Sequence, residues 1–260
     1  MLITLTTDFG LRDAFVGVMK GVIARINPEA YVIDLTHGIP AQDILAGALT
    51  LRHSVAYFPS GTIHVAVIDP GVGSARRPLL IESDGNFFIG PDNGVLSLAV
   101  RYAPETRIVQ LTNPAYQLQP GSSTFHGRDI FAPAAAYLSR GVAPAEFGET
   151  LDSLVKLSLP QVSRAGHELA GEVIYSDKFG NLFTNIEPHD LTDAKKKRLE
   201  IAFADLRIYG LAANYAAAGA GQFVAVINSW GFLEIALNHG NAAERLGAKV
   251  GDKVTLTFRD

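Results

Sequence analysis

The stretch IHVAVIDPGVGSARR, residues 63–77, decides how the first half of this chain folds. Its first six residues are mostly β-branched or apolar, which predicts a buried strand. Asp69 follows this strand directly, and Pro70 and two glycines then form a tight turn with exposed backbone N–H groups. Arg76 comes seven residues after Asp69 and can return to pair with it. In a parallel sheet, ligands collect at the carboxyl ends of strands, so this turn is a candidate site.

On both sides of this stretch, short apolar runs alternate with segments of helical periodicity. We expect strands over residues 2–6, 31–35 and 63–68, a hairpin over 79–82 and 87–89, and helices over 13–25, 44–58, 94–102 and 129–140. This alternation predicts an α/β domain in which a mostly parallel sheet is flanked by helices.

The pattern changes near LSLPQVSRAG, residues 157–166. Beyond it, short strand-like runs separated by glycine turns dominate, over residues 168–175, 198–203, 222–228 and 253–258. Such a series predicts a smaller, β-barrel-like domain. We therefore expect an N-terminal α/β domain over residues 1–162 and a C-terminal β-rich domain over residues 163–260.

The composition limits the classes of function. The 260 residues are 48% hydrophobic, carry a formal charge of −4, and include one basic run, Lys195–Arg198, which we expect to face water. This charge distribution argues against nucleic-acid binding. The chain has no cysteine, which excludes thiolate chemistry and fits a reducing cytoplasm. It shows no signal peptide and no apolar run long enough to span a membrane, so we expect a soluble, cytoplasmic protein.

Common catalytic motifs are missing from the sequence. It has no P-loop, no H-E-x-x-H and no G-x-S-x-G. Gly71-Val72-Gly73 begins like a dinucleotide fingerprint, but arginines and a further strand follow where the third glycine and a helix belong. A dinucleotide site is therefore excluded.

Three polar positions in the first half are candidates for chemistry. Asp8 follows the first strand, where its carboxylate suits ribose hydroxyls or a metal; a cap for the next segment is the less favoured alternative. Asp69 could belong to the site, or with equal weight it could be a turn residue whose side chain accepts hydrogen bonds from its own backbone. A histidine such as His126 is more often structural than catalytic. It lies, however, in the polar-aromatic turn TFHGRD before a helix.

In the second half, the segments 176–185 and 228–238 are dense in aromatic and amide residues. Phe179, Phe183 and Trp230 could sandwich a flat base, or they could belong to the core of the β domain. Asn181 and Ser229 lie next to glycine or aromatic turns, from which side chains can reach a ligand.

Six motifs together resemble the S-adenosyl-L-methionine (SAM) hydroxide adenosyltransferase family, which is related to the fluorinase and chlorinase enzymes. In order along nearly the whole chain they are TTDFG, VIDPGVGSARR, GPDNG, TFHGRD, DKFGNLFTN and NSWGFLEIA. The resemblance implies an N-terminal α/β domain, a C-terminal β-barrel-like domain, and homotrimers with sites at subunit interfaces. It also implies a SAM hydrolase that forms adenosine and L-methionine, with SAM as substrate and with no cofactor or metal.

The resemblance also assigns roles to individual residues. The catalytic set of the water-using members falls on Asp69, Arg76 and His126, with Arg77 as the alternative arginine. Substrate-binding roles fall on Asp8 (ribose hydroxyls), Thr124 and Phe125 (ribose and reacting carbon), Phe179 and Asn181 (adenine), and Asp177, Ser229 and Trp230 (the methionine group, at Trp230 through its backbone).

Two departures from the halogenating relatives favour water over halide as the nucleophile. Those relatives have tyrosines in place of Asp69 and His126, and a long insertion where this chain has only residues 78–86. In the expected reaction, a water held in line behind C5′ displaces methionine. Arg76 would stabilise hydroxide, His126 would accept or relay the proton, and Asp69 would orient the pair. The alternatives are a chloride adenosyltransferase, a metal-dependent nucleotide phosphomonoesterase that uses Asp8, and a SAM or adenosine sensor without turnover.

Overall fold

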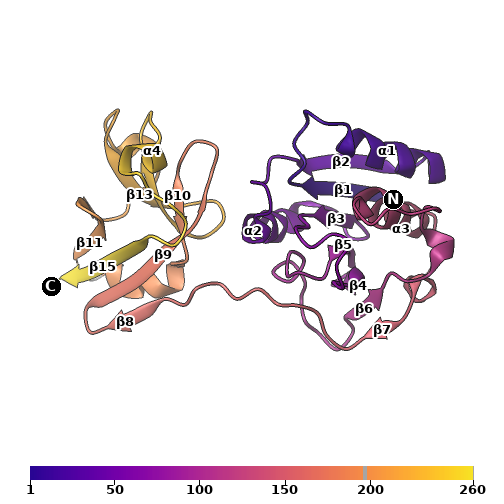
Figure 1. Ribbon diagram of the computed structural model, residues 1–260. Helices are drawn as coiled ribbons and strands as arrows, with labels where there is room; N and C mark the ends of the chain where they lie inside the picture. The colour runs from indigo at the N-terminus through magenta and orange to yellow at the C-terminus, as the bar shows by residue number, and fades with distance from the viewer. Residues whose placement is uncertain (196–197, 260) are drawn as a thin grey trace. The chain divides into compact units, whose positions relative to one another are not determined.

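The computed structural model describes residues 1–195 and 198–259, which form two compact units, Met1–Leu157 and Ser158–Asp260 (Figure 1). The domain boundary predicted after residue 162 falls at the end of the segment 153–162, which has neither helix nor strand. Lys196 and Lys197, in the basic run that we expected to face water, lie outside the described residues.

A seven-stranded sheet forms the centre of the N-terminal unit, in the order β2-β1-β3-β5-β4-β6-β7. The strands are β1 (Leu2–Thr7), β2 (Tyr31–Thr36), β3 (Ile63–Val67), β4 (Pro78–Ser83), β5 (Asn86–Pro91), β6 (Arg107–Gln110) and β7 (Thr150–Leu151). The neighbours β2, β1, β3 and β5 are parallel, whereas β4, β6 and β7 extend the sheet with antiparallel pairs. The predicted α/β class and the predicted β4–β5 hairpin are both confirmed.

The helices of this unit are α1 (Phe15–Ile26), α2 (Ile44–Ser54) and α3 (Ala132–Ser139), with a π-helix at Gly127–Phe131 and 3₁₀ turns at Val55–Tyr57, Pro114–Tyr116 and Pro144–Phe147. α1 packs against α3, and their apolar faces share one core with β1 and β3. From β1 the chain crosses through α1 to β2 on one side, whereas from β2 it crosses through α2 to β3 on the other side of β1. The strand order therefore reverses between β1 and β3, which is where α/β sheets bind ligands.

The predicted helix over residues 94–102 is wrong. Residues 95–99 form successive turns, in which Ser97 N–H donates to the Gly94 carbonyl oxygen at 2.9 Å and Ala99 N–H donates to that of Leu96 at 3.2 Å. Gly94 has a φ of +100°, and the Ser97 hydroxyl also donates to the Gly94 carbonyl oxygen. The apolar periodicity that suggested a helix reflects the burial of Val95 and Leu96 within these turns.

The C-terminal unit is an antiparallel sheet that curves until its edge strands β12 and β13 come into contact. Its elements are β8 (Ser163–Ala165), β9 (Glu168–Ser176), β10 (Leu182–Thr184), β11 (Arg198–Phe203), β12 (Leu206–Tyr209), β13 (Phe223–Ile227), β14 (Leu233–Leu237), α4 (Ala242–Leu246) and β15 (Lys253–Arg259), with 3₁₀ turns at Pro188–Lys195 and Tyr215–Ala217. Alternate residues of these strands fill the interior, as expected for a barrel-like unit. This confirms the predicted second fold. In the described parts of both units, no helix combines the length and apolarity needed to cross a membrane.

Candidate active site

Three of the predicted site residues form a continuous chain of hydrogen bonds in the N-terminal unit. Arg76 Nε donates to Asp69 Oδ1 at 2.9 Å, and Arg76 Nη2 also contacts Asp69 Oδ2. The same Nη2 lies 2.6 Å from His126 Nδ1. The side chains of Asp69 and Arg76 are only 5% and 8% exposed, so water screens this ion pair weakly. Asp69 and His126, which are 57 positions apart in the sequence, are thus joined through one guanidinium.

A cavity of about 130 Å³ lies in front of this chain of residues. Asp69 and His126 line it, whereas Arg76 holds the two from one side and stacks on Phe131 with its Cζ 5.6 Å from the ring centroid. The remaining lining residues are mostly apolar or aromatic: Phe9, Phe15, Val67, Val72, Thr124, Phe125 and Gly127. The cavity thus lies at the reversal point between β1 and β3, because Phe9 follows β1 and Asp69 follows β3.

The contact with Arg76 determines how His126 is protonated. A guanidinium carries donors and no acceptor, so His126 Nδ1 must be unprotonated and accept from Arg76. In the neutral ring the proton is then on Nε2, which becomes a donor. Burial, and then the positive charge of Arg76, lower the pKa of His126 below its ordinary 6.5, although Asp69 and Asp129 oppose this shift. His126 is therefore neutral at physiological pH.

We expect the His126 ring to titrate below pH 6.5, because a proton on Nδ1 would face the guanidinium of Arg76. An NMR titration of the ring protons measures this directly. In Arg76→Gln the opposing charge is gone, so the pKa of His126 should rise toward its ordinary value. A His126 pKa at or above 6.5 in the unaltered chain would contradict the assigned tautomer.

Arg77, the alternative to Arg76, belongs to a different pair. Its Nε donates to Asp92 Oδ2 at 2.7 Å, and its Nη2 donates to the Ser153 carbonyl oxygen at 3.0 Å. Asp92 Oδ1 in turn accepts from Val155 N–H at 2.7 Å. These contacts fasten the segment after β7 to the end of β5. Neither Arg77 nor Asp92 lines the cavity.

The loop that carries Thr124 lies against the turn after β3. Gly73 has a φ of +78°, and a side chain there would bring its Cβ within 2.4 Å of the Ser123 carbonyl oxygen. This close approach explains why the turn needs glycine. Asp129 fixes the other side of the loop by accepting from Ser122 N–H at 2.7 Å. Ser122 and Thr124 share a hydroxyl–hydroxyl bond of 2.9 Å, so Thr124 is held at the cavity.

Asp8 lies beside the cavity and does not line it. It is partly buried, and its Oδ2 accepts from the backbone N–H of Gln42 at 2.8 Å. This bond does not cap the segment after β1, as we had considered for Asp8, because Gln42 belongs to the loop that follows β2. Asp8 therefore links the loops after the first two strands, and its other oxygen, Oδ1, accepts no hydrogen bond from the described residues.

In the C-terminal unit, Asp177 and Asn181 lie together in the β9–β10 turn. Asp177 Oδ1 accepts from the backbone N–H groups of Phe179 and Asn181, both at 2.9 Å, and its Oδ2 accepts from Asn181 Nδ2 at 2.9 Å. Asp177 therefore organises its own turn. Phe179 projects from this turn with 71% of its surface exposed.

Trp230 and Ser229 lie in the β13–β14 turn. Trp230 stacks on Tyr175 with ring centroids 5.3 Å apart and meets Phe183 edge to face at 5.2 Å. Phe183 is 7% exposed and belongs to the core of the barrel. Ser229 is exposed, and Asn228 shapes its turn by accepting from the backbone N–H groups of Trp230 and Phe232.

Sequence reasoning missed the aromatic wall of the cavity. The rings of Phe9, Phe15 and Phe125 contact one another, with centroid distances of 5.2–5.9 Å. Phe9 was visible in the TTDFG motif, but nothing in the spacing indicated that Phe15, at the start of α1, would meet Phe125. In the part of the chain that the structure describes, no cluster of three or more His, Asp or Glu side chains is arranged to hold a metal ion.

Comparison with known proteins identifies the family. Residues 3–148 match the SAM hydroxide adenosyltransferase N-terminal domain, and residues 171–255 match its C-terminal domain. The chain belongs to the SAM hydroxide adenosyltransferase family. A (R)-S-adenosyl-L-methionine hydrolase from Salinispora arenicola is 38% identical, with 98% of this chain and 97% of that protein aligned. One from Thermus thermophilus is 37% identical over 96% of this chain and 97% of its own length.

Solved structures and halogenating relatives extend the comparison. A crystal structure of an uncharacterized conserved protein from Thermotoga maritima shares 32% identity and a TM-score of 0.88, and the match covers 99% of this chain and 100% of that one. A fluorinase from an Actinoplanes species is 27% identical over 98% of this chain and 97% of its own length. The relatives of this chain therefore include both kinds of enzyme, and the hydrolases named above are more similar to it than that fluorinase.

Proposed function

We propose that the protein hydrolyses SAM to adenosine and L-methionine through in-line attack of water on C5′. Relatives that are 34–38% identical over nearly their whole length carry the name (R)-S-adenosyl-L-methionine hydrolase. The observation that carries the proposal is the Asp69–Arg76–His126 chain, which presents a carboxylate and a neutral imidazole N–H to one cavity.

The bonding changes follow from the chemistry of a sulfonium. Water oxygen forms a bond to C5′ while the C5′–S bond breaks, and the electron pair leaves with sulfur as neutral methionine thioether. Because the departing sulfur is already cationic, no acid and no metal is required, and we expect chelators to leave turnover unchanged. The water must lose one proton, and the Asp69 carboxylate is the acceptor that lines the cavity. From there the proton passes to solvent.

In this proposal the role of His126 differs from the one that the resemblance implied, in which the ring accepts or relays the proton. With its proton on Nε2, His126 donates to the water oxygen and orients its lone pair; it does not remove the proton. Arg76 Nη1 is buried and has no hydrogen-bond partner among the described residues. Leaving such a donor unpaired costs about 1–3 kcal/mol. An oxygen atom held by both His126 Nε2 and Arg76 Nη1 would give Nη1 a hydrogen-bond partner and lie close to Asp69.

The aromatic wall suits a cationic substrate. The faces of Phe9, Phe15 and Phe125 carry negative π density, which attracts a positive centre that is removed from water. A sulfonium is such a centre. The wall also excludes competing water, so the attacking molecule is the one that Asp69 and His126 hold.

The rest of the substrate needs more surface than this cavity offers. Its volume of about 130 Å³ is below the roughly 300 Å³ at which small-molecule sites begin. From the resemblance to the family we propose that the working enzyme is a homotrimer with sites at subunit interfaces, and a cavity of this size fits a site that a second subunit completes. Ribose would bind Asp8, Thr124 and Phe125, and the adenine and methionine groups would bind residues of the C-terminal unit: Asp177, Phe179, Asn181, Ser229 and Trp230. We place the enzyme in the cytoplasm because the chain has no cysteine to oxidise.

The competing function is chloride transfer to C5′, by analogy with the halogenating relatives. A halide in this cavity would lie beside the Asp69 carboxylate, and two negative charges repel each other strongly where solvent is scarce. A neutral water molecule is not repelled by the carboxylate in this way. The metal-dependent phosphomonoesterase is not proposed, since the comparisons lend it no support.

Incubation with SAM and excess chloride tests the function. We expect adenosine and methionine in equal amounts, with no 5′-chlorinated nucleoside, by liquid chromatography and mass spectrometry. Tight binding of SAM with no product of either kind would identify a sensor and overturn the proposal.

A further inference from the structure

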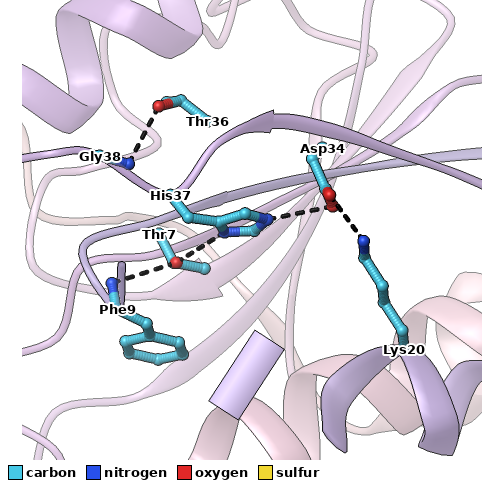
Figure 2. Close-up of polar contacts among 7 residues, drawn as sticks. All are labelled: Thr7, Phe9, Lys20, Asp34, Thr36, His37 and Gly38. Carbon is cyan, nitrogen blue, oxygen red and sulfur yellow. Dashed lines mark hydrogen bonds and ion pairs between the residues drawn. The ribbon is translucent and has the colours of Figure 1, made fainter. Parts of the chain in front are cut away.

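A second chain of polar contacts joins α1, β2 and the end of β1 next to Phe9 (Figure 2). Lys20 Nζ donates to Asp34 Oδ2 at 2.6 Å, and His37 Nε2 lies 3.0 Å from Asp34 Oδ1. His37 Nδ1 lies 2.9 Å from the hydroxyl of Thr7, and this hydroxyl accepts from Phe9 N–H at 3.2 Å. The chain runs from the surface at Lys20 to Thr7, which is fully buried at the end of β1.

The contacts of this chain meet at Asp34 and at the Thr7 hydroxyl. Asp34 can only accept, so it accepts from Lys20, and its 3.0 Å contact with His37 Nε2 is a close polar contact that lacks hydrogen-bond geometry. Burial alone would raise the pKa of Asp34, but its contacts with Lys20 and His37 lower it, so this acceptor stays ionised. His37 Nδ1 and the Thr7 hydroxyl share a hydrogen bond of 2.9 Å. The Thr7 oxygen also accepts from Phe9 N–H, and this bond fixes the start of the loop.

Two backbone contacts join the same histidine segment to the candidate active site. Gly10 N–H donates to the His37 carbonyl oxygen at 2.8 Å, and Gln42 N–H donates to Asp8 Oδ2 at 2.8 Å. Gln42 adopts a φ of +66°, which a residue with a side chain holds only when its surroundings impose it. The loops after β1 and β2 are thus fastened together at Thr7, Asp8 and Gly10.

We propose that Thr7 and His37 are positioning residues, which hold Asp8 and Phe9 in the geometry that binds the ribose and the sulfonium of the substrate. The proposal rests on the function proposed above. Thr7 and His37 do not line the cavity. They act through the backbone of the loop, which sets both the ribose-binding carboxylate and one ring of the aromatic wall. Their loss should therefore weaken substrate binding and leave the rate of the bound complex nearly unchanged.

The chain supplies a matched control three residues earlier on β1. The hydroxyl of Thr4 lies 2.9 Å from His64 Nδ1, both residues are fully buried, and neither lines the cavity. Thr4→Val and Thr7→Val each remove one buried hydroxyl from a threonine–histidine pair. A merely structural role would make the two variants behave alike. Thr7→Ser keeps the hydroxyl and should restore the unaltered behaviour.

The experiment combines hydrogen exchange with binding and kinetics. In Thr7→Val we expect faster amide exchange at Phe9, Gly10 and Gln42, and a Kd for adenosine and a KM for SAM raised about 10-fold at nearly constant kcat. Thr4→Val should change none of these, although both variants should lower Tm. Equal behaviour of the two valine variants in exchange and in adenosine binding would overturn the proposal. If the unaltered chain releases no adenosine from SAM, the proposed function fails, whereas amide exchange still decides whether Thr7 positions the loop.

Discussion

Asp69→Asn is expected to lower kcat for adenosine release from SAM by about 10²–10⁴-fold, the range for loss of a general base. The amide keeps the size of the side chain but cannot take the proton from water. It also removes the charge that Arg76 pairs with, so the guanidinium loses its main partner. Steady-state kinetics with chromatographic detection of adenosine measures the effect.

Asp92→Asn is the matched control for this substitution. Asp92 is as well buried as Asp69 and pairs with the neighbouring arginine, Arg77, but it lies away from the cavity. Asp69→Asn breaks a pair that is buried on both sides and should lower the free energy of unfolding by up to about 3–5 kcal/mol, whereas Asp92→Asn breaks a pair whose arginine is partly exposed and should lower it less. Only Asp69→Asn should affect kcat strongly. A loss of kcat in Asp92→Asn as large as that in Asp69→Asn would show that the effect comes from instability.

Arg76→Gln is expected to lower kcat by about 10²–10³-fold, because Arg76 joins Asp69 to His126 and offers a further buried donor, Nη1. Arg77→Gln should leave kcat within about 3-fold, since the partners of Arg77 are Asp92 and the Ser153 carbonyl oxygen. We expect the loss in free energy of unfolding to be that of breaking an ordinary, partly exposed ion pair. Kinetics of the two variants, each with its Tm, separates the two arginines. The assignment is wrong if Arg77→Gln is the inactive variant.

Much of the fold could be predicted from local patterns. The strand over Ile63–Val67 is apolar and β-branched, and the change to short strands beyond residue 163 marks the second fold. The turn over residues 94–99 was mistaken for a helix because buried apolar side chains recur there with similar spacing. The hydrogen bonds of Ser97 in this turn include tertiary contacts. Leu157 N–H, for example, donates to the Ser97 hydroxyl at 3.0 Å, and the local sequence does not reveal this contact.

The site could be predicted only in part, because it too depends on tertiary contacts. Asp69 and Arg76 are close in sequence and could be paired from the turn between them. His126 joins them only because the loop before the π-helix packs against Gly73, a contact over 50 residues. The choice between Arg76 and Arg77, and the tautomer of His126, needed the directions of individual side chains. The chain from Lys20 to Thr7 was not foreseen at all, since its members come from β1, α1, β2 and the loop after β2.

Hydrolysis of SAM in ¹⁸O-labelled water tests the central claim most directly. If a water held by Asp69 and His126 attacks C5′, mass spectrometry will find one ¹⁸O atom in adenosine, at the 5′ position, and none in methionine. Release of 5′-methylthioadenosine, a 5′-chlorinated nucleoside, or adenosine without the label would contradict the account.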